Sequence, residues 1–339
     1  MINHKSQNLS EFRRDLVSGD WILFAPARKK RPGSEKIGEK KRIIPPLENC
    51  PFENPEPVVL WEPLPGKKNP EDWLVRIKSN KYPAVAPHKI CPQEEKNGIY
   101  STIGGVGFHE VIVTRYHQKT IAEMSAEEVE ILIKAYQKRF RQLKNEPCIQ
   151  YILIFHNFGE GAGATIFHPH SQIIALPIIP LDVRRSFSGS RAYFKEKGKC
   201  VHCEMVKIDS KDKARIVYEN KDFVVLCPFA SQVSFEMRIY PKKHQPYFEE
   251  ISEKERLSFA EALKESLVRL KAGADDPDYN FFVHTAPPAD GEYKYYHWHL
   301  EILPRMARWA GLELGSGTNV VAVSPEEAAD ILRKSKIKY

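Results

Sequence analysis

The stretch FHEVIVTRYH at residues 108–117 returns 127 positions later as FEMRIYPKKH at residues 235–244. Both stretches alternate apolar and polar side chains, which is typical of a strand with one buried face. At the same offset, Ser125 and Ser252 each precede a glutamate by three residues, a capping box that begins a helix. The sequence therefore predicts a duplicated unit in which strands are followed by a long helix.

Further matched features extend the repeat on both sides of these helices. Each helix leads to an apolar strand, at 151–155 and 280–283, and then to two alternating histidines. Segment 75–87 resembles segment 216–228, and Cys50 lies 150 residues before Cys200. This order predicts an α+β fold with antiparallel sheet, built as an N-terminal half (1–185) and a C-terminal half (186–339). The apolar stripes expected to pack are Val129, Leu132, Ile133, Tyr136, Phe140 and Leu143 in the first helix, and Leu257, Ala260, Leu263, Leu267 and Leu270 in the second.

Composition narrows the class of protein. The 339 residues carry a net charge of +7 without a pure basic block, which argues against a nucleic-acid tail. A mean hydropathy of -0.45 and a polar N-terminus argue against a membrane span and a signal peptide, so we expect a cytoplasmic protein without a membrane partner. Six cysteines are too few for a disulfide scaffold, and Cys91, Cys148 and Cys227, which lack motif partners, are expected to be packing residues.

The stretch GAGATIFHPHSQ at residues 161–172 carries the most chemistry. Its small residues allow backbone amides to approach an anion, and His168 and His170 project to one face if the segment is extended. A neutral imidazole can attack phosphorus, and Gln172 offers a neutral amide donor. The alternative is that these histidines are metal ligands or ordinary polar residues at a strand end.

A second cluster of metal-binding residue types lies in the C-terminal half. Cys200 and Cys203 have CxxC spacing, and the repeat supplies His244 and His297, which together make a tetrahedral zinc set. These features alone leave open a non-enzymatic, zinc-stabilised nucleotide or nucleic-acid binding module. That module does not explain HPHSQ, and no aromatic-basic stripe suits stacked bases, so we expect no nucleic-acid partner.

HPHSQ at 168–172 resembles the HPHxQ motif of the galactose-1-phosphate uridylyltransferases, a family of two fused histidine-triad (HIT-like) units with antiparallel sheets and flanking helices. The resemblance covers nearly the whole chain from Arg13 onward. It implies that His170 attacks the α-phosphorus of a nucleotide sugar while Gln172 holds a phosphoryl oxygen. The implied reaction moves a uridylyl group from UDP-glucose to galactose 1-phosphate through uridylyl-His170, in a protein expected to form a homodimer.

The same resemblance implies roles for further residues. Those expected to bind the substrate are Arg28, Arg31, Asn80, Asn157, Gly163, Thr165 and Glu313. A first zinc site would use Cys50, Glu53, His117 and His168, with Glu53 in place of the cysteine that other members carry. The stretch 182–186 lacks the glutamate that binds iron in some members, so iron is doubtful. His284 and His299 are expected to line a degenerate second half, and His109 is expected to be structural.

One alternative lies within the same fold. The sequence IIALP after HSQ, the CxxC at Cys200, and GLELGSG at 311–317 resemble the branch containing ADP-glucose phosphorylases, in which phosphate accepts an adenylyl group. The choice between a uridine and an adenosine nucleotide stays open at this point.

Overall fold

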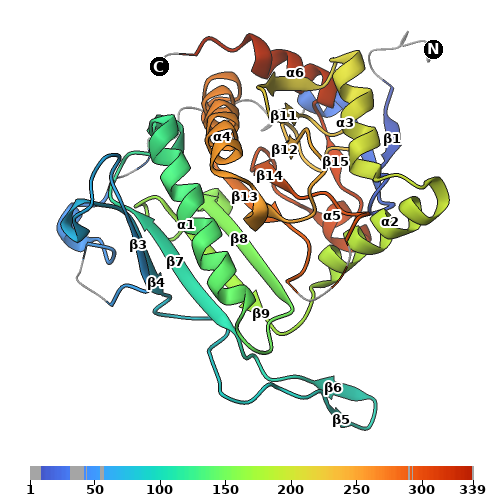
Figure 1. Ribbon diagram of the computed structural model, residues 1–339. Coiled ribbons are helices and arrows are strands. Elements are labelled where there is room, and N and C mark those ends of the chain that lie inside the picture. Colours follow the sequence, from blue (N-terminus) through green and yellow to red (C-terminus); the bar gives the residue numbers. More distant parts are fainter. Residues whose placement is uncertain are drawn as a thin grey trace.

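The computed structural model describes residues 9–30, 42, 44–53, 57–288, 291 and 293–337. One antiparallel sheet of ten strands runs through it in the order β10-β11-β12-β14-β13-β8-β9-β7-β4-β3 (Figure 1). Its strands are β3 (Leu60–Pro63), β4 (Trp73–Ser79), β7 (Phe108–Thr114), β8 (Tyr151–Phe158), β9 (His170–Leu176), β10 (Ile216–Glu219), β11 (Phe223–Leu226), β12 (Met237–Pro241), β13 (Tyr279–His284) and β14 (His299–Pro304). Because β8 and β13 pair directly, the two copies of the repeat share a single sheet. The α+β expectation is confirmed.

The two halves of this sheet have equivalent strand orders on the two sides of the β8–β13 pair. Strands β7 and β12, which carry the repeated stretches, occupy equivalent places next to β9 and β14. The match of 75–87 with 216–228 is wrong, because β4 pairs with β7 whereas β10 lies at the sheet edge beside β11. Strands β4 and β10 are each followed by an Asn-Lys turn, but pairing with the neighbouring strand determines the place of a strand in a sheet.

Two long helices, α1 (Ala126–Lys144) and α4 (Glu253–Gly273), pack against each other and contribute to one hydrophobic core with the sheet. Both capping boxes are present at Ser125 and Ser252, as predicted. The apolar stripe of α1 is buried throughout. In α4, Leu257 is 39% exposed, so its assignment to the core is wrong; Phe259 lies in the core beside the other predicted residues.

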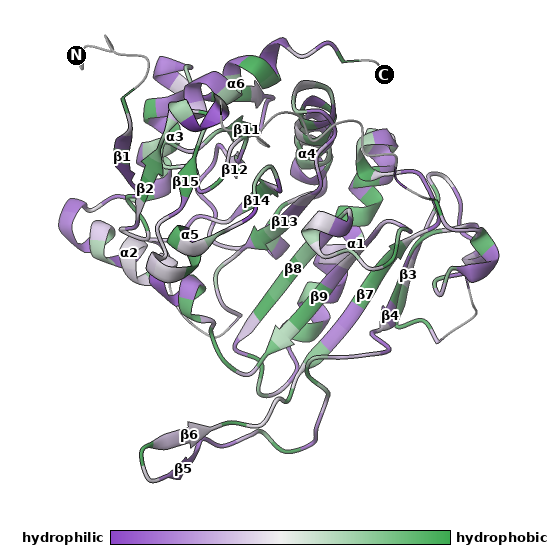
Figure 2. Ribbon diagram, turned by 180° about the vertical axis from the view of Figure 1, so that it is seen from behind, coloured by the Kyte–Doolittle hydropathy of each residue, from purple (hydrophilic) through white to green (hydrophobic). Residues whose placement is uncertain are grey.

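The remaining elements surround this sheet. They are the helices α2 (Leu181–Lys197), α3 (Val201–Asp212), α5 (Gly311–Ser316) and α6 (Pro325–Lys334), the small sheet β1 (Glu11–Arg14), β2 (Trp21–Phe24) and β15 (Val320–Val321), the hairpin β5 (Glu95–Asn97) and β6 (Tyr100–Thr102), and the 3₁₀ turns η1 (Pro26–Lys30), η2 (Leu47–Asn49), η3 (Pro70–Asp72), η4 (Ile121–Glu123), η5 (Glu160–Ala162) and η6 (Phe248–Glu250). Figure 2 shows β8 and β9 mostly in the hydrophobic colour and β1 in the hydrophilic one. Among the helices of the described residues, none is both long enough and apolar enough to cross a membrane.

A disulfide corrects one expectation from the sequence. Cys91 and Cys148, expected to be packing residues, are bonded to each other. Their separation of 57 residues matches no motif, and only the folded chain brings their Cα atoms to 5.2 Å. The bond ties the segment that leads into the protruding β5–β6 hairpin to the connection between α1 and β8 (Figure 1). Cys227 is fully buried, which agrees with a packing role.

Candidate active site and metal centres

His170, the first residue of β9, is 8% exposed and has a defined tautomer. Its Nδ1 lies 2.9 Å from the carbonyl oxygen of His168, and because a carbonyl only accepts, Nδ1 must carry the proton. The lone pair of the neutral ring is therefore on Nε2. Burial lowers the pKa of His170, although the bond to His168 opposes this shift, so the ring is neutral near pH 7. A neutral imidazole with a free Nε2 is a competent nucleophile.

Neighbouring residues fix the position of the strand that carries this ring. Ser171 points to the opposite face from His170, and its hydroxyl lies 2.5 Å from the Tyr136 hydroxyl and 3.0 Å from His156 Nδ1. On the His170 side of the strand, the Phe52 ring meets His170 edge-on with ring centroids 4.9 Å apart. Strand β9 is thus anchored to α1 and β8 by polar contacts from one face, while His170 and Gln172 share the other.

His109 lies beside two residues predicted for the site, a contact that the sequence did not indicate. It was expected to be structural, but its Nε2 lies 2.8 Å from Gln172 Oε1 and 3.3 Å from the amide nitrogen of Asn80. The predicted nucleoside-binding turn at Asn80 is therefore brought next to the HPHSQ motif. Only the pairing of β7 with β9 creates this contact, and no motif spacing indicates it.

The first predicted metal set is assembled. Glu53 Oε1 lies 3.2 Å from His168 Nδ1 and 3.8 Å from His117 Nδ1, and Cys50 Sγ lies 3.5 Å from His168 Nδ1. Ligand atoms of a tetrahedral zinc site are separated by roughly 3.3–3.8 Å, as follows from its usual bond lengths. Nε2 of each histidine is bonded to a backbone carbonyl, so both Nδ1 atoms are available to a metal. The set with Glu53 fits zinc.

The second predicted metal set is also assembled. Cys203 Sγ lies 3.3 Å from His244 Nδ1 and 3.4 Å from His297 Nδ1, and Cys200 completes a group whose ligand atoms all lie within 4.8 Å of one another. Cys200 stands at the N-cap of α3, where a thiolate is favoured by the helix dipole. Hydrogen bonds from Cys203 and the two histidines lower the pKa of Cys200. The donor set suits a structural zinc ion.

In the second half, a buried group of charged side chains surrounds the counterparts of His170 and Gln172. His299 and Glu301 occupy the positions of His170 and Gln172 in the mirrored sheet. Glu301 accepts a bond from Arg238 at 3.1 Å and lies 3.0 Å from His284 Nε2, and Arg238 also binds Glu236. All of these residues except the half-buried His284 are buried. Although burial opposes it, Arg238 holds the pKa of Glu301 well below its usual value.

A third group of possible metal ligands consists of His284, His299 and Glu301. Glu301, the carboxylate beside His284 and His299, is already neutralised by Arg238, and Asp182 in α2 has an almost fully exposed side chain. That the second half is degenerate stays a prediction.

A family model described as galactose-1-phosphate uridyl transferase, N-terminal domain, matches residues 2–180 of the chain. The chain belongs to the galactose-1-phosphate uridylyltransferase family. The resemblance found in HPHSQ is confirmed.

Relatives within this family carry two different names. ADP-glucose phosphorylase of Arabidopsis thaliana is 32% identical over 96% of this chain and 92% of its own length. Galactose-1-phosphate uridylyltransferase of Thermotoga maritima is 27% identical over 97% of this chain and all of its own length. All these relatives are named as enzymes, which argues against the non-enzymatic binding module.

The similar solved structures include the same two kinds of enzyme, an ADP-glucose phosphorylase and a uridylyltransferase. A crystal structure of the Arabidopsis thaliana ADP-glucose phosphorylase with bound ADP-glucose has a TM-score of 0.82 and 30% identity, covering 98% of this chain and all of that one. A structure of a uridylyltransferase has a TM-score of 0.73 and 28% identity, covering 96% and 97% of the two chains.

The other residues that the family resemblance points to lie in several places. Asn157 in β8 accepts a bond from Asn280 at 2.8 Å. Gly163 adopts a φ of +84° after η5, which favours glycine, and Thr165 nearby is exposed. Glu313 bonds the Ala310 amide at 2.9 Å and so caps α5. Arg28 is exposed in η1, which follows β2 of the three-stranded sheet β1-β2-β15. Arg31 lies outside the described residues.

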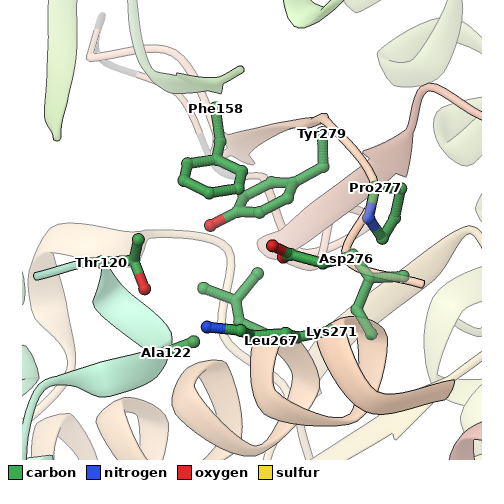
Figure 3. A pocket seen from close by; sticks show the side chains of 9 residues that line it. Thr120, Ala122, Phe158, Leu267, Lys271, Asp276, Pro277 and Tyr279 are labelled. Atoms are coloured by element: carbon green, nitrogen blue, oxygen red, sulfur yellow. The ribbon is translucent and has the colours of Figure 1, made fainter. Parts of the chain in front are cut away.

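A small pocket between α4 and the strands β8 and β13 is separate from these residues (Figure 3). Leu267 and Lys271 of α4, together with Phe158 and Tyr279, line it. Lys271 is paired with Glu123 at 2.8 Å, so its charge is already compensated. We assign this pocket no role.

Proposed function

We propose that the protein transfers a nucleotidyl group from a nucleotide sugar to an acceptor in two steps through His170. Nε2 attacks the α-phosphorus, a P–N bond forms, and the P–O bond to the departing hexose 1-phosphate breaks. The acceptor oxygen then attacks the same phosphorus and releases His170. The observation that supports this most directly is the bond from Nδ1 to His168, which leaves the Nε2 lone pair free. Gln172 would stabilise charge on the phosphoryl oxygens.

The substrates we propose first are UDP-glucose as donor and galactose 1-phosphate as acceptor, as in the relatives named uridylyltransferases. Arg28, Arg31, Asn157, Gly163 and Thr165 would contact the phosphates. Asn80 would contact the nucleoside and Glu313 the sugar.

A second candidate is phosphorolysis of ADP-glucose, with inorganic phosphate as acceptor. It is favoured by the higher identity to the ADP-glucose phosphorylase, 32% against 27%. The nucleophile and the first step would be the same for both candidates.

The remaining features of the proposal concern the assembly. Zinc would occupy both Cys/His sets and hold together the segments that carry them, with no part in bond breaking. We also propose a cytoplasmic homodimer with halves at 1–185 and 186–339.

Covalent labelling tests the function. The protein is incubated with UDP-glucose or ADP-glucose without acceptor, and its intact mass is measured. Wild type should gain one nucleotidyl group with one donor, and His170→Ala should gain none. His88→Ala, a change of an exposed histidine, serves as the control and should be labelled like wild type. Normal labelling of His170→Ala would refute the assignment. Adding galactose 1-phosphate or phosphate to the labelled protein then identifies the acceptor.

A further inference from the structure

His109 lies beside the Gln172 amide, and its own tautomer is determined by a third contact. The backbone N–H of Ala84 donates to His109 Nδ1 at 3.1 Å. Because a backbone N–H can only donate, Nδ1 must hold the lone pair, and the proton of the neutral ring is on Nε2. His109 therefore presents an N–H donor toward β9.

That donor has one suitable acceptor among its two neighbours. The Asn80 side chain turns its amide nitrogen toward His109, because its Oδ1 accepts from the Tyr82 amide at 2.9 Å. Gln172 presents Oε1 at 2.8 Å, so Nε2–H donates to Gln172. Rotating the Gln172 amide by half a turn would set its NH₂ group against Nε2–H, two donors facing each other, which costs the bond.

The orientation of the Gln172 amide follows from this contact. Its oxygen is held by His109, so its NH₂ group is the part available to a phosphoryl oxygen. Gln172 shares a sheet face with His170, two residues away on β9, where charge develops as Nε2 attacks. An amide that presented its oxygen there would repel the phosphoryl oxygens.

We propose that His109 is a positioning residue that fixes the Gln172 amide with its NH₂ group toward the transferring phosphoryl group. This inference rests on the proposed nucleotidyl transfer through His170. His109 acts through Gln172 and is not a catalytic residue itself. Ala84 supports it by fixing the tautomer in which Nε2 carries the proton.

Single-turnover nucleotidylation of His170, followed by intact mass, tests the proposal with whichever donor labels wild type. His109→Phe keeps a ring of similar size but has no N–H, and it should slow nucleotidyl transfer, by no more than the roughly 10²-fold that losing the Gln172 donor itself would cost. Donor affinity should change less than the rate. His109→Gln places an amide near the Nε2 position and should restore most of the rate. His88→Phe, at an exposed histidine, is the matched control and should match wild type.

Two further variants separate positioning from folding. If His109 acts through Gln172, adding His109→Phe to Gln172→Ala should cause no further loss of rate. Gln172→Glu can still accept from His109 but cannot donate to a phosphoryl oxygen, and it should be slow while folding normally. Three outcomes would each overturn the proposal. They are a double variant whose fold-loss in rate is the product of the two single losses, a wild-type rate in His109→Phe, and full activity in Gln172→Glu. If wild type forms no adduct with either donor, the proposed function fails with it; labelled wild type with an unaffected His109→Phe overturns only the role of His109.

Discussion

Opening the Cys91–Cys148 disulfide should destabilise the protein by an amount that follows from the chain it encloses. The two cysteines are separated by 57 residues, and the loop-closure entropy of such a loop corresponds to about 4 kcal/mol. For 339 residues that unfold as one unit, with about 2.1 cal/mol/K of unfolding entropy per residue, this is a fall in Tm of about 6 °C. The enclosed segment contains α1 and β7, so the bond constrains the first half of the sheet and not the hairpin alone.

Calorimetry of wild type and of the double variant Cys91→Ser with Cys148→Ser, each with and without a phosphine reductant, measures this effect. Reductant should lower the Tm of wild type to that of the variant and leave the variant unchanged. Thiol titration of the denatured, chelator-treated wild type should find the four free cysteines Cys50, Cys200, Cys203 and Cys227. Six reactive thiols without reductant, or a wild-type Tm that ignores the reductant, would refute the reasoning.

Two other perturbations address the first metal set and a buried carboxylate. Glu53→Cys should raise zinc affinity, since thiolate is the softer and stronger ligand. Competition with a chelator measures this affinity, and Glu95→Cys, which adds a thiol at an exposed site, is the control. An unchanged affinity in Glu53→Cys would argue against Glu53 as a ligand. Glu326 is partly buried, which alone would raise its pKa, but Arg13 and Arg215 hold that pKa below its ordinary value. Between the two values the unfolded chain binds more protons, so this stability is present above about pH 4.5 and is lost as the pH falls through the folded-state pKa. Urea unfolding at pH 6 and pH 3.5 should show a smaller pH effect in Glu326→Gln, and an equal effect in both proteins would contradict the assignment.

Much of the fold could be predicted because the duplication repeats local patterns with clear physical meaning. Ser125 and Ser252 begin their helices as predicted, since a capping box is a local arrangement of neighbouring residues. The match of 75–87 with 216–228 failed because an alternating strand before an Asn-Lys turn says nothing about its neighbour in the sheet. Leu257 was misplaced because a helix's apolar stripe has edges that only packing against a partner defines.

For the candidate site, the spacing of residues along the sequence could predict a group of possible metal ligands, but it could not predict contacts that form between paired strands. Cys200 is the N-cap of α3 and Cys203 lies in its first turn, and the repeat identified His244 and His297 as the histidines that complete the group. The contact of His109 with Gln172 joins residues 63 positions apart through strand pairing, and the Cys91–Cys148 bond likewise depends on the folded chain. Neither contact has a spacing that could have indicated it.

The buried group of Arg238, Glu236 and Glu301 distinguishes the second half of the sheet from the first. Truncating Arg238 alone would leave the Glu301 carboxylate without its cation in the protein interior, a change that costs several kcal/mol. A substitution of one member of this group should therefore destabilise the protein unless its partners change as well. The three side chains therefore depend on one another, and they can be exchanged for apolar residues at little cost only when all three are replaced together.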